Sequence, residues 1–151
     1  MVKTDVLKQQ VLLEEIDKAG LNRIAKIIKQ VSVKKGESLF KESDSTSGLW
    51  LIAAGKIEIS RVTADGWRQT LVVLPAGHFF GELSILENRQ HVASAVALDD
   101  TDLLLIPKEE FEKMMTDDCA LALAIVKKIA IVMSKNLRRM NDKFLSALIS
   151  Y

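Results

Sequence analysis

The sequence is poor in cysteine, since Cys119 is the single one among 151 residues. One cysteine cannot form an intrachain disulfide, and Cys119, His78 and His91 do not stand at metal-ligand spacing. Because the pattern around Cys119 is apolar and helical, we expect it to be a buried structural thiol. The shortage argues against a disulfide-stabilised fold and predicts that no metal is bound.

Long apolar runs and a charge bias are also missing. No run approaches the roughly 20 apolar residues that cross a bilayer, and the opening MVKTDVLKQQ lacks the apolar core of a signal peptide. The net charge is +1, from 21 basic and 20 acidic residues, so the basic excess typical of nucleic-acid binders is absent. We expect a soluble cytoplasmic protein without a membrane segment.

Familiar catalytic motifs are missing as well. The sequence contains no G-x-S-x-G, no H-E-x-x-H and no G-x-x-x-x-G-K-[ST]. Glu82 and His91 have the chemistry of an acid–base pair, but nothing resembling a nucleophile or a metal site accompanies them. We therefore expect no enzymatic activity.

Three segments with different patterns are present. In residues 1–30, apolar side chains recur near helical spacing from position 4 onward, and Gly20 interrupts them, which predicts two short helices separated at that glycine. Residues 31–108 contain short β-branched and aromatic runs between glycines, which predict about eight strands of a small antiparallel sandwich or barrel. Residues 109–151 return to a helical pattern.

Two details of the middle segment are more specific. Ile57, Ile59 and Val62 alternate with polar residues, apart from one slip in the alternation. Asp65-Gly66 lies between two strand-like runs, which is typical of a β-hairpin.

A long helix is predicted from about Asp118 to Ala147, after a short helix that begins behind Pro107. It carries a heptad-like apolar seam: Val126, Ala130, Met133, Leu137, Met140, Phe144 and Ala147. Two interpretations remain open. The seam packs against the chain's own β-segment, or it forms a dimer interface, possibly with its later half.

Four motifs occur in a fixed order: KKGESLF, GLWLIAAGKIEIS, LPAGHFFGELSIL and DLLLIPKEEFEKMM. Together they resemble the cyclic-nucleotide-binding domain, the β-roll module of catabolite activators and of protein kinase A regulatory subunits. The resemblance covers nearly the whole chain. It implies a mostly β fold with flanking α: a double-stranded β-helix (jelly-roll-like β-roll) over 31–108, with N-terminal helices at 1–30 and C-terminal helices at 109–151, all one domain.

The resemblance also implies a phosphate-binding cassette at residues 78–95. Gly81 permits a close backbone approach, and a short helix after it would direct the amides of Leu83 and Ser84 at the phosphate. By analogy, Glu82 would accept a hydrogen bond from the ribose 2′-hydroxyl, although alone it is typical of an ordinary helix-starting acid. The sugar and the base are expected to contact apolar side chains: Leu71, Val73 and Leu83.

The family motif then needs an arginine followed by small residues, and this sequence departs from it. Counted as in the kinase subunits, the position is His91; counted as in the bacterial activators, it is Val92, with Ala93 next. His91 would compensate in part, because its unperturbed pKa of about 6.5 leaves it partly cationic near neutral pH. Arg89 would do so if its loop folded inward, whereas an exposed loop histidine is the commonest alternative for His91.

Three functions remain open on this pattern. The chain is a regulatory module that binds cyclic AMP or cyclic GMP, weakly or with His91 or Arg89 in the arginine's place; or it binds another anion or an uncharged ligand; or it is a degenerate, ligand-free scaffold for protein interaction or dimerisation. Apart from the candidate ligand, no cofactor is expected. Ligand entry would move the C-terminal helices, with a homodimer through the 118–147 helix and no DNA-binding domain.

Overall fold

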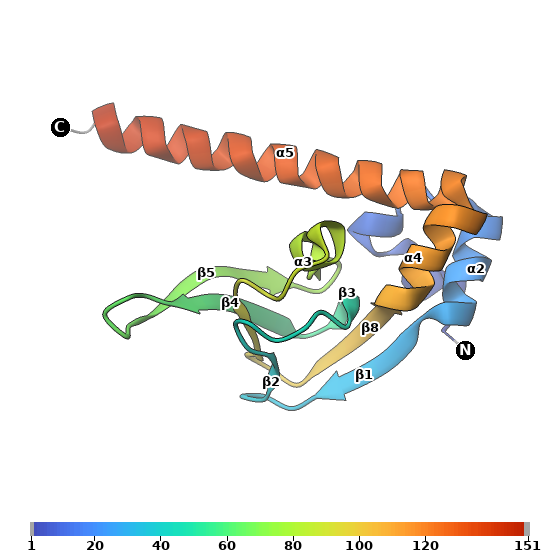
Figure 1. The fold of residues 1–151 in the computed structure, drawn as a ribbon, viewed down its shortest axis with the longest axis horizontal. Helices are drawn as coiled ribbons and strands as arrows, with labels where there is room; N and C mark the ends of the chain where they lie inside the picture. The colour runs from blue at the N-terminus through green and yellow to red at the C-terminus, as the bar shows by residue number, and fades with distance from the viewer. Residues whose placement is uncertain (1, 150–151) are drawn as a thin grey trace.

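The computed structural model describes residues 2–149, so residue 1 and residues 150–151 of the predicted terminal segments lie outside it. Figure 1 shows short N-terminal helices, curved sheets and one long C-terminal helix. The helices are α1 (Thr4–Lys8), the 3-10 helix η1 (Val11–Leu13), α2 (Lys18–Ile27), α3 (Glu82–Glu87), α4 (Lys108–Asp117) and α5 (Cys119–Ile149). The strands are β1 (Lys29–Val33), β2 (Ser38–Phe40), β3 (Gly48–Ala54), β4 (Lys56–Val62), β5 (Arg68–Pro75), β6 (Phe79–Phe80), β7 (Ser94–Ala97) and β8 (Thr101–Pro107).

The strands form two four-stranded sheets whose pairings are all antiparallel. One sheet has the order β1-β8-β3-β6 and the other the order β2-β7-β4-β5. The predicted mostly β fold, with helices before it and a long helix after it, is confirmed.

β4 and β5 form the hairpin that Asp65-Gly66 predicts. The pairing of β4 with β5 shifts register between Ile59 and Ser60, because Ile59 pairs with Val72 and Ser60 pairs with Thr70. The extra residue of this bulge is Leu71 on β5. In β4 itself, Ser60 is buried and Val62 is exposed, so the apolar alternation beyond Ile59 does not mark the buried face. β5 is the edge strand of its sheet, and most of its residues are exposed.

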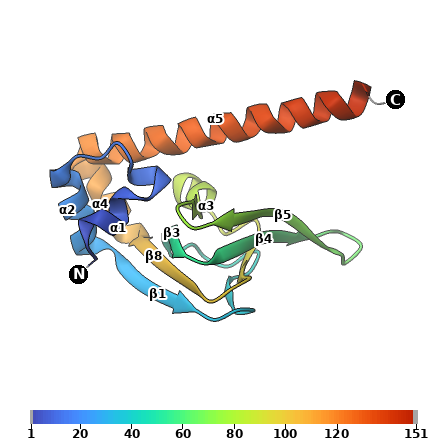
Figure 2. The same ribbon diagram turned by 180° about the vertical axis from the view of Figure 1, so that it is seen from behind.

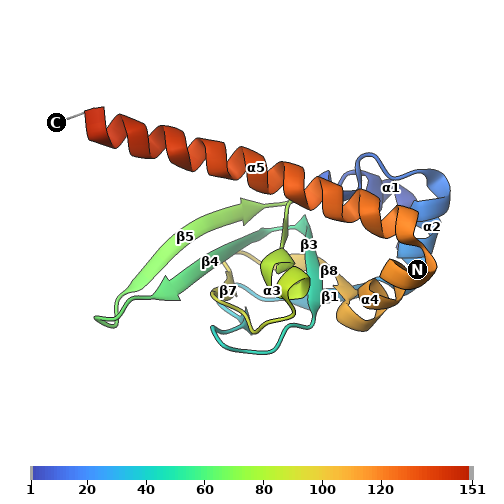
Figure 3. The ribbon, with the colours of Figure 1, turned by 45° about the horizontal axis from the view of Figure 1, so that its top comes forward.

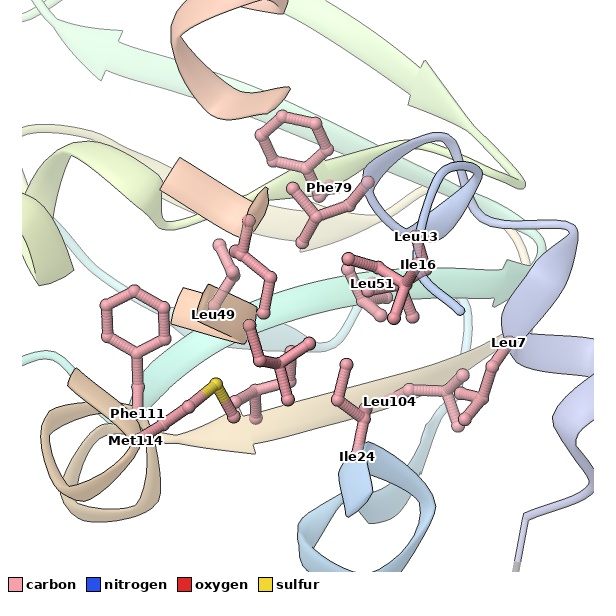
Figure 4. Close-up of a cluster of buried hydrophobic side chains, with 14 of the residues drawn as sticks. Leu7, Leu13, Ile16, Ile24, Leu49, Leu51, Phe79, Leu104, Phe111 and Met114 are labelled. Carbon is pink, nitrogen blue, oxygen red and sulfur yellow. The ribbon is translucent and has the colours of Figure 1, made fainter. Parts of the chain in front are cut away.

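Two buried apolar clusters hold these parts together. The larger one joins the helices to the first sheet (Figure 4) and includes Leu7, Ile24, Leu49, Leu51, Leu104, Phe111 and Met114. The smaller one fills the space between the two sheets and includes Trp50, Ile52, Ile57, Phe80, Ala95 and Leu103. Each large apolar side chain buried in this way stabilises the fold by about 1.5–3 kcal/mol.

The predicted break at Gly20 is wrong, because Gly20 lies inside α2. The helices separate before Lys18, where Asp17 caps α2 by accepting a hydrogen bond from the Gly20 amide at 2.8 Å. A Cβ at position 20 would lie 2.5 Å from Ile16 Cγ2 and 3.0 Å from Leu121 Cδ1. The glycine therefore permits α2 to pack closely rather than ending a helix.

The prediction of a buried thiol is also wrong. Cys119 is exposed at the first residue of α5, and its Sγ donates to the carbonyl oxygen of Met115 at 3.2 Å. The apolar pattern that suggested burial belongs to the residues that follow, of which Leu121 and Ala122 are buried.

α5 divides into two halves with different surroundings. In its first half, Leu121, Ala122, Ile125 and Ile129 are buried in the larger cluster. Figures 2 and 3 show the rest of the helix extending past this contact, in the same direction as the β4–β5 hairpin. Within residues 2–149, no helix is both long and apolar enough to cross a membrane.

Candidate ligand site

The strand–turn–helix that carries the predicted cassette begins at Gly81. β6 pairs with β3 and brings Gly81 to the start of α3, where its φ of 87° is left-handed. A Cβ there would lie 3.0 Å from the carbonyl oxygen of Gly48, so both the conformation and the close approach favour glycine. The short helix expected after the Gly-Glu pair is present as α3.

His91 lies inside this region rather than in solvent. Its side chain is 5% exposed, and its ring stacks on Phe40 with the ring centres 3.5 Å apart and the planes 7° from parallel. Its Nδ1 is 3.0 Å from the Ser84 hydroxyl of α3. Val92 is 36% exposed. Of the two positions at which the family's arginine was expected, 91 and 92, position 91 is therefore the one whose side chain faces α3.

The environment of His91 disfavours a positive charge. Burial lowers the pKa of His91 below its ordinary 6.5, and the nearby carboxylate of Asp44 opposes this only in part. Arg89 does not fold inward: its side chain is 60% exposed and pairs with Glu87 at 3.5 Å. Neither expected substitute for the family's arginine places a buried positive charge beside α3 near neutral pH.

Glu82 is the first residue of α3 and is partly buried. Burial raises the pKa of its carboxyl above the ordinary 4.5, and a hydrogen bond from its own backbone amide offsets this in part. Among residues 2–149, no cation forms an ion pair with it. The carboxylate is thus partly desolvated and holds acceptor capacity for a donor such as a ligand hydroxyl.

We expect Glu82→Gln to raise the free energy of unfolding near neutral pH by about 1 kcal/mol, because an unpaired charge is no longer desolvated. The pKa of Glu82 is raised on folding, so the cost of the carboxylate appears as pH rises above 4.5 and is absent below it. Urea unfolding at about pH 4 and about pH 7 measures the difference. Glu87→Gln, at an exposed residue of the same helix, is the control, and an equal loss of stability at both pH values would contradict the expectation.

The remaining predicted residues are not gathered into one enclosed space. Leu71 and Val73 lie on the edge strand β5 and are 54% and 44% exposed, and Leu83 on α3 is 42% exposed. Ala93 is buried beside the cassette loop. The apolar side chains expected around a sugar and a base therefore face outward.

A cavity of about 240 Å³ lies next to the loop that carries His91. Three of the predicted residues line it, namely Arg89, His91 and Val92, together with Glu42, Ser43, Arg61 and Gln90. Sequence reasoning missed Arg61, which lies near the end of β4 and pairs with Glu42 at 3.5 Å. Two guanidinium groups and one carboxylate give this cavity the chemistry to hold a small anion.

No group of three or more metal-ligating side chains occurs within the described part of the chain.

The fold and the cassette agree with one family of proteins. The model of the cyclic nucleotide-binding domain matches residues 30–118. The chain belongs to the cyclic nucleotide-binding domain family. The match begins next to β1 and ends next to α5, so it covers all eight strands, α3 and α4.

Two relatives found by sequence similarity are also cyclic-nucleotide-related regulators by name. The Cyclic AMP receptor protein of Thermus thermophilus is 38% identical over 77 residues, which are 51% of this chain and 36% of that protein. The cAMP-dependent protein kinase regulatory subunit of Dictyostelium discoideum is 23% identical over 113 residues, which are 73% of this chain and 35% of that protein. This chain spans little more than a third of either relative.

Two solved structures share the fold. The Thermus thermophilus catabolite activator protein superimposes with a TM-score of 0.77 at 24% identity, covering 89% of this chain and 62% of that one. The N-terminal domain of a transcriptional regulator from Streptomyces coelicolor superimposes with a TM-score of 0.73 at 25% identity, covering 93% and 95%.

Proposed function

We propose that the chain is a cytoplasmic, non-enzymatic regulatory module that senses a cyclic nucleotide, cyclic AMP or cyclic GMP, or a related anion. The observation that carries this proposal is the turn at Gly81, which is left-handed, closely packed and followed at once by Glu82 and α3. This arrangement leaves first-turn amides of α3 available to a phosphate and the Glu82 carboxyl available to a ribose hydroxyl. Family membership and the names of the relatives support the choice of ligand.

A second function is favoured by one specific observation. The His91 ring is already packed between Phe40 and Ser84, where a ligand's phosphate would have to approach α3. A cassette filled by its own side chain is also what a ligand-free scaffold would show. The two functions differ in whether any cyclic nucleotide displaces this ring.

We also propose that the signal is transmitted through α5 and that α5 forms a parallel homodimer. From Met133 onward its seam is open to solvent: Met133, Leu137, Met140 and Phe144 are 38%, 59%, 65% and 64% exposed. Leu123, 67% exposed, continues the same heptad position towards the start of the helix.

Charge on the second half of α5 is compatible with such a pair. The seam residues occupy a and d heptad positions, which places Asn136 and Lys143 at the flanking g positions. Asn141 and Leu148 are at the flanking e positions, so Lys143 of one copy faces Leu148 of the other. Lys135, Arg138 and Arg139 then lie on the outer face. Two copies therefore meet along an apolar seam without like charges directly opposite each other.

Thermal unfolding with added nucleotide tests the ligand proposal. A ligand that binds only the folded state at about 100 times its Kd adds about 2.7 kcal/mol, which for a domain of about 150 residues raises Tm by roughly 5–10 °C. We expect cyclic AMP or cyclic GMP at millimolar concentration to raise Tm. The 2′-deoxy analogue is expected to be weaker, because Glu82 then loses its hydroxyl partner.

His78→Gln, at an exposed first residue of the cassette that does not line the cavity, is the control variant and should keep the full shift. No shift with either nucleotide, up to the solubility limit, would favour the ligand-free scaffold instead.

A further inference from the structure

His91 connects three separate parts of the chain. Its backbone amide donates to the carbonyl oxygen of Asp44 at 2.9 Å, and its carbonyl oxygen accepts from the Ser43 amide at 2.8 Å. Its ring stacks on Phe40 at the end of β2 and meets the Ser84 hydroxyl of α3. One residue thus joins the 41–47 loop, the 88–93 loop and the cassette helix.

The contacts of the ring suit the neutral form. Neutral imidazole and a hydroxyl make a complete pair, since each can donate or accept. The protonated form would bury a positive charge in a site that is 5% exposed. The carboxylate of Asp44 favours that charge. Arg61 and Arg89 line the adjoining cavity, and each is paired with a glutamate, Glu42 and Glu87 respectively. Burial outweighs the effect of Asp44, so the pKa of His91 is lowered.

We propose that neutral His91 is a pH-sensitive latch that holds the 41–47 and 88–93 loops against α3, and that mild acid releases it. In the released state the imidazolium ring leaves the space beside Ser84 and faces the cavity next to Arg61 and Arg89. An anion then enters with three cations around it, so anion binding is accompanied by uptake of a proton. The pH-dependent opening of the loops does not depend on the proposed function, whereas its coupling to a cyclic nucleotide does.

The sign of the effect follows from linkage. The pKa of His91 is lower in the folded chain than the ordinary 6.5, so the closed form binds fewer protons than the open or unfolded forms. The latch is therefore intact above 6.5 and weakens as pH falls below that value. One proton difference changes the ratio of open to closed forms by up to about tenfold per pH unit.

The test is a histidine and amide-exchange titration by NMR between about pH 8 and pH 5. We expect His91 to titrate below the ordinary 6.5 of a histidine, because burial lowers its pKa. Protection of the Ser43 and His91 amides, corrected for intrinsic exchange, should fall by up to about tenfold per pH unit. Amides of the β3–β8 ladder should keep their protection.

Two variants separate the latch from a general loss of stability. His91→Gln does not titrate, so its loop protection should be independent of pH, whereas His78→Gln should keep the wild-type profile. If His91 titrates at or above the ordinary 6.5, or if wild-type loop protection does not change with pH, the latch is disproved without the use of any variant.

Calorimetry with cyclic AMP at about pH 5.5 and about pH 7.5 tests the coupling. We expect binding to be tighter at the lower pH by up to about tenfold, with proton uptake seen as a dependence of the heat on buffer ionisation. Loop opening without nucleotide binding would support the latch and contradict the proposed ligand. Binding of equal strength at both pH values would support the ligand and overturn the coupling.

Discussion

His91→Arg is expected to strengthen binding of cyclic AMP by about 100-fold or more. A guanidinium–phosphate fork provides two charge-assisted hydrogen bonds of about 1.5–3 kcal/mol each, and each 1.4 kcal/mol is a factor of ten in Kd. The side chain at position 91 faces α3 and Ser84, so an arginine there would point toward the helix where the phosphate is expected to bind. The variant also lacks the ring stack on Phe40, which the wild type has to break before a ligand enters, and this adds to the gain.

Without ligand, the same variant is expected to be less stable than the wild type by about 1–3 kcal/mol. The space between Phe40 and Ser84 fits a flat five-membered ring, and a longer charged side chain either overfills it or leaves it empty. Added nucleotide should restore the lost stability.

Val92→Arg is the matched control for the two possible registers of the cassette. Position 92 is 36% exposed and lines the cavity rather than contacting Ser84. Isothermal titration of both variants at one pH and one salt concentration should therefore show a large gain for position 91 and little for position 92. The reverse order would place the phosphate by the register of the bacterial activators, and no gain in either variant would contradict a cyclic-phosphate site beside α3.

Leu137→Glu is expected to convert the proposed homodimer to monomer, weakening self-association by about 100-fold or more. Each dimer contains the substitution twice, and each copy places a carboxylate in an apolar seam at a cost of several kcal/mol. Leu137 is 59% exposed in the single chain, so the fold of the monomer should be unchanged. Sedimentation equilibrium measures the association, and circular dichroism checks the helix.

Leu145→Glu is the control for this second prediction. Leu145 is 53% exposed in the same half of α5 but lies off the seam, at an outer heptad position. We expect it to associate like the wild type. A wild-type chain that stays monomeric at about 100 µM, where weak specific dimers of Kd near 1 µM are saturated, would contradict the dimer itself.

Most of the fold could be predicted from local pattern. The short apolar runs between glycines and the hairpin dipeptide Asp65-Gly66 each depend on neighbours in sequence, and each has its counterpart in the strands. Gly20 and Cys119 were misjudged because their environments depend on residues far along the chain. Gly20 is small to admit Leu121, and Cys119 stands on the exposed side of the first turn of α5.

The candidate site was less predictable for the same reason. The sequence places Gly81, Glu82 and a short helix together, because they are consecutive. It does not show that Phe40, about fifty residues earlier, forms a stack with His91, nor that Arg61 adjoins the cassette loop. The later half of the seam is open to solvent, while the first half of α5 packs on the chain through a neighbouring face. The residues that pack on the chain are therefore not the seam residues, and the dimer interface stays a prediction.

The way α5 is anchored sets the scale of any motion at its end. The buried contacts of α5 with the larger apolar cluster end near Ile129. The residues from there to Ile149 extend for about 30 Å at 1.5 Å per residue. A tilt of about 10° at the anchored end would carry the tip through about 5 Å, close to one helical turn. A change of conformation too small to disturb the packed core would thus produce a displacement of several ångströms at the end of α5, where a second molecule would bind.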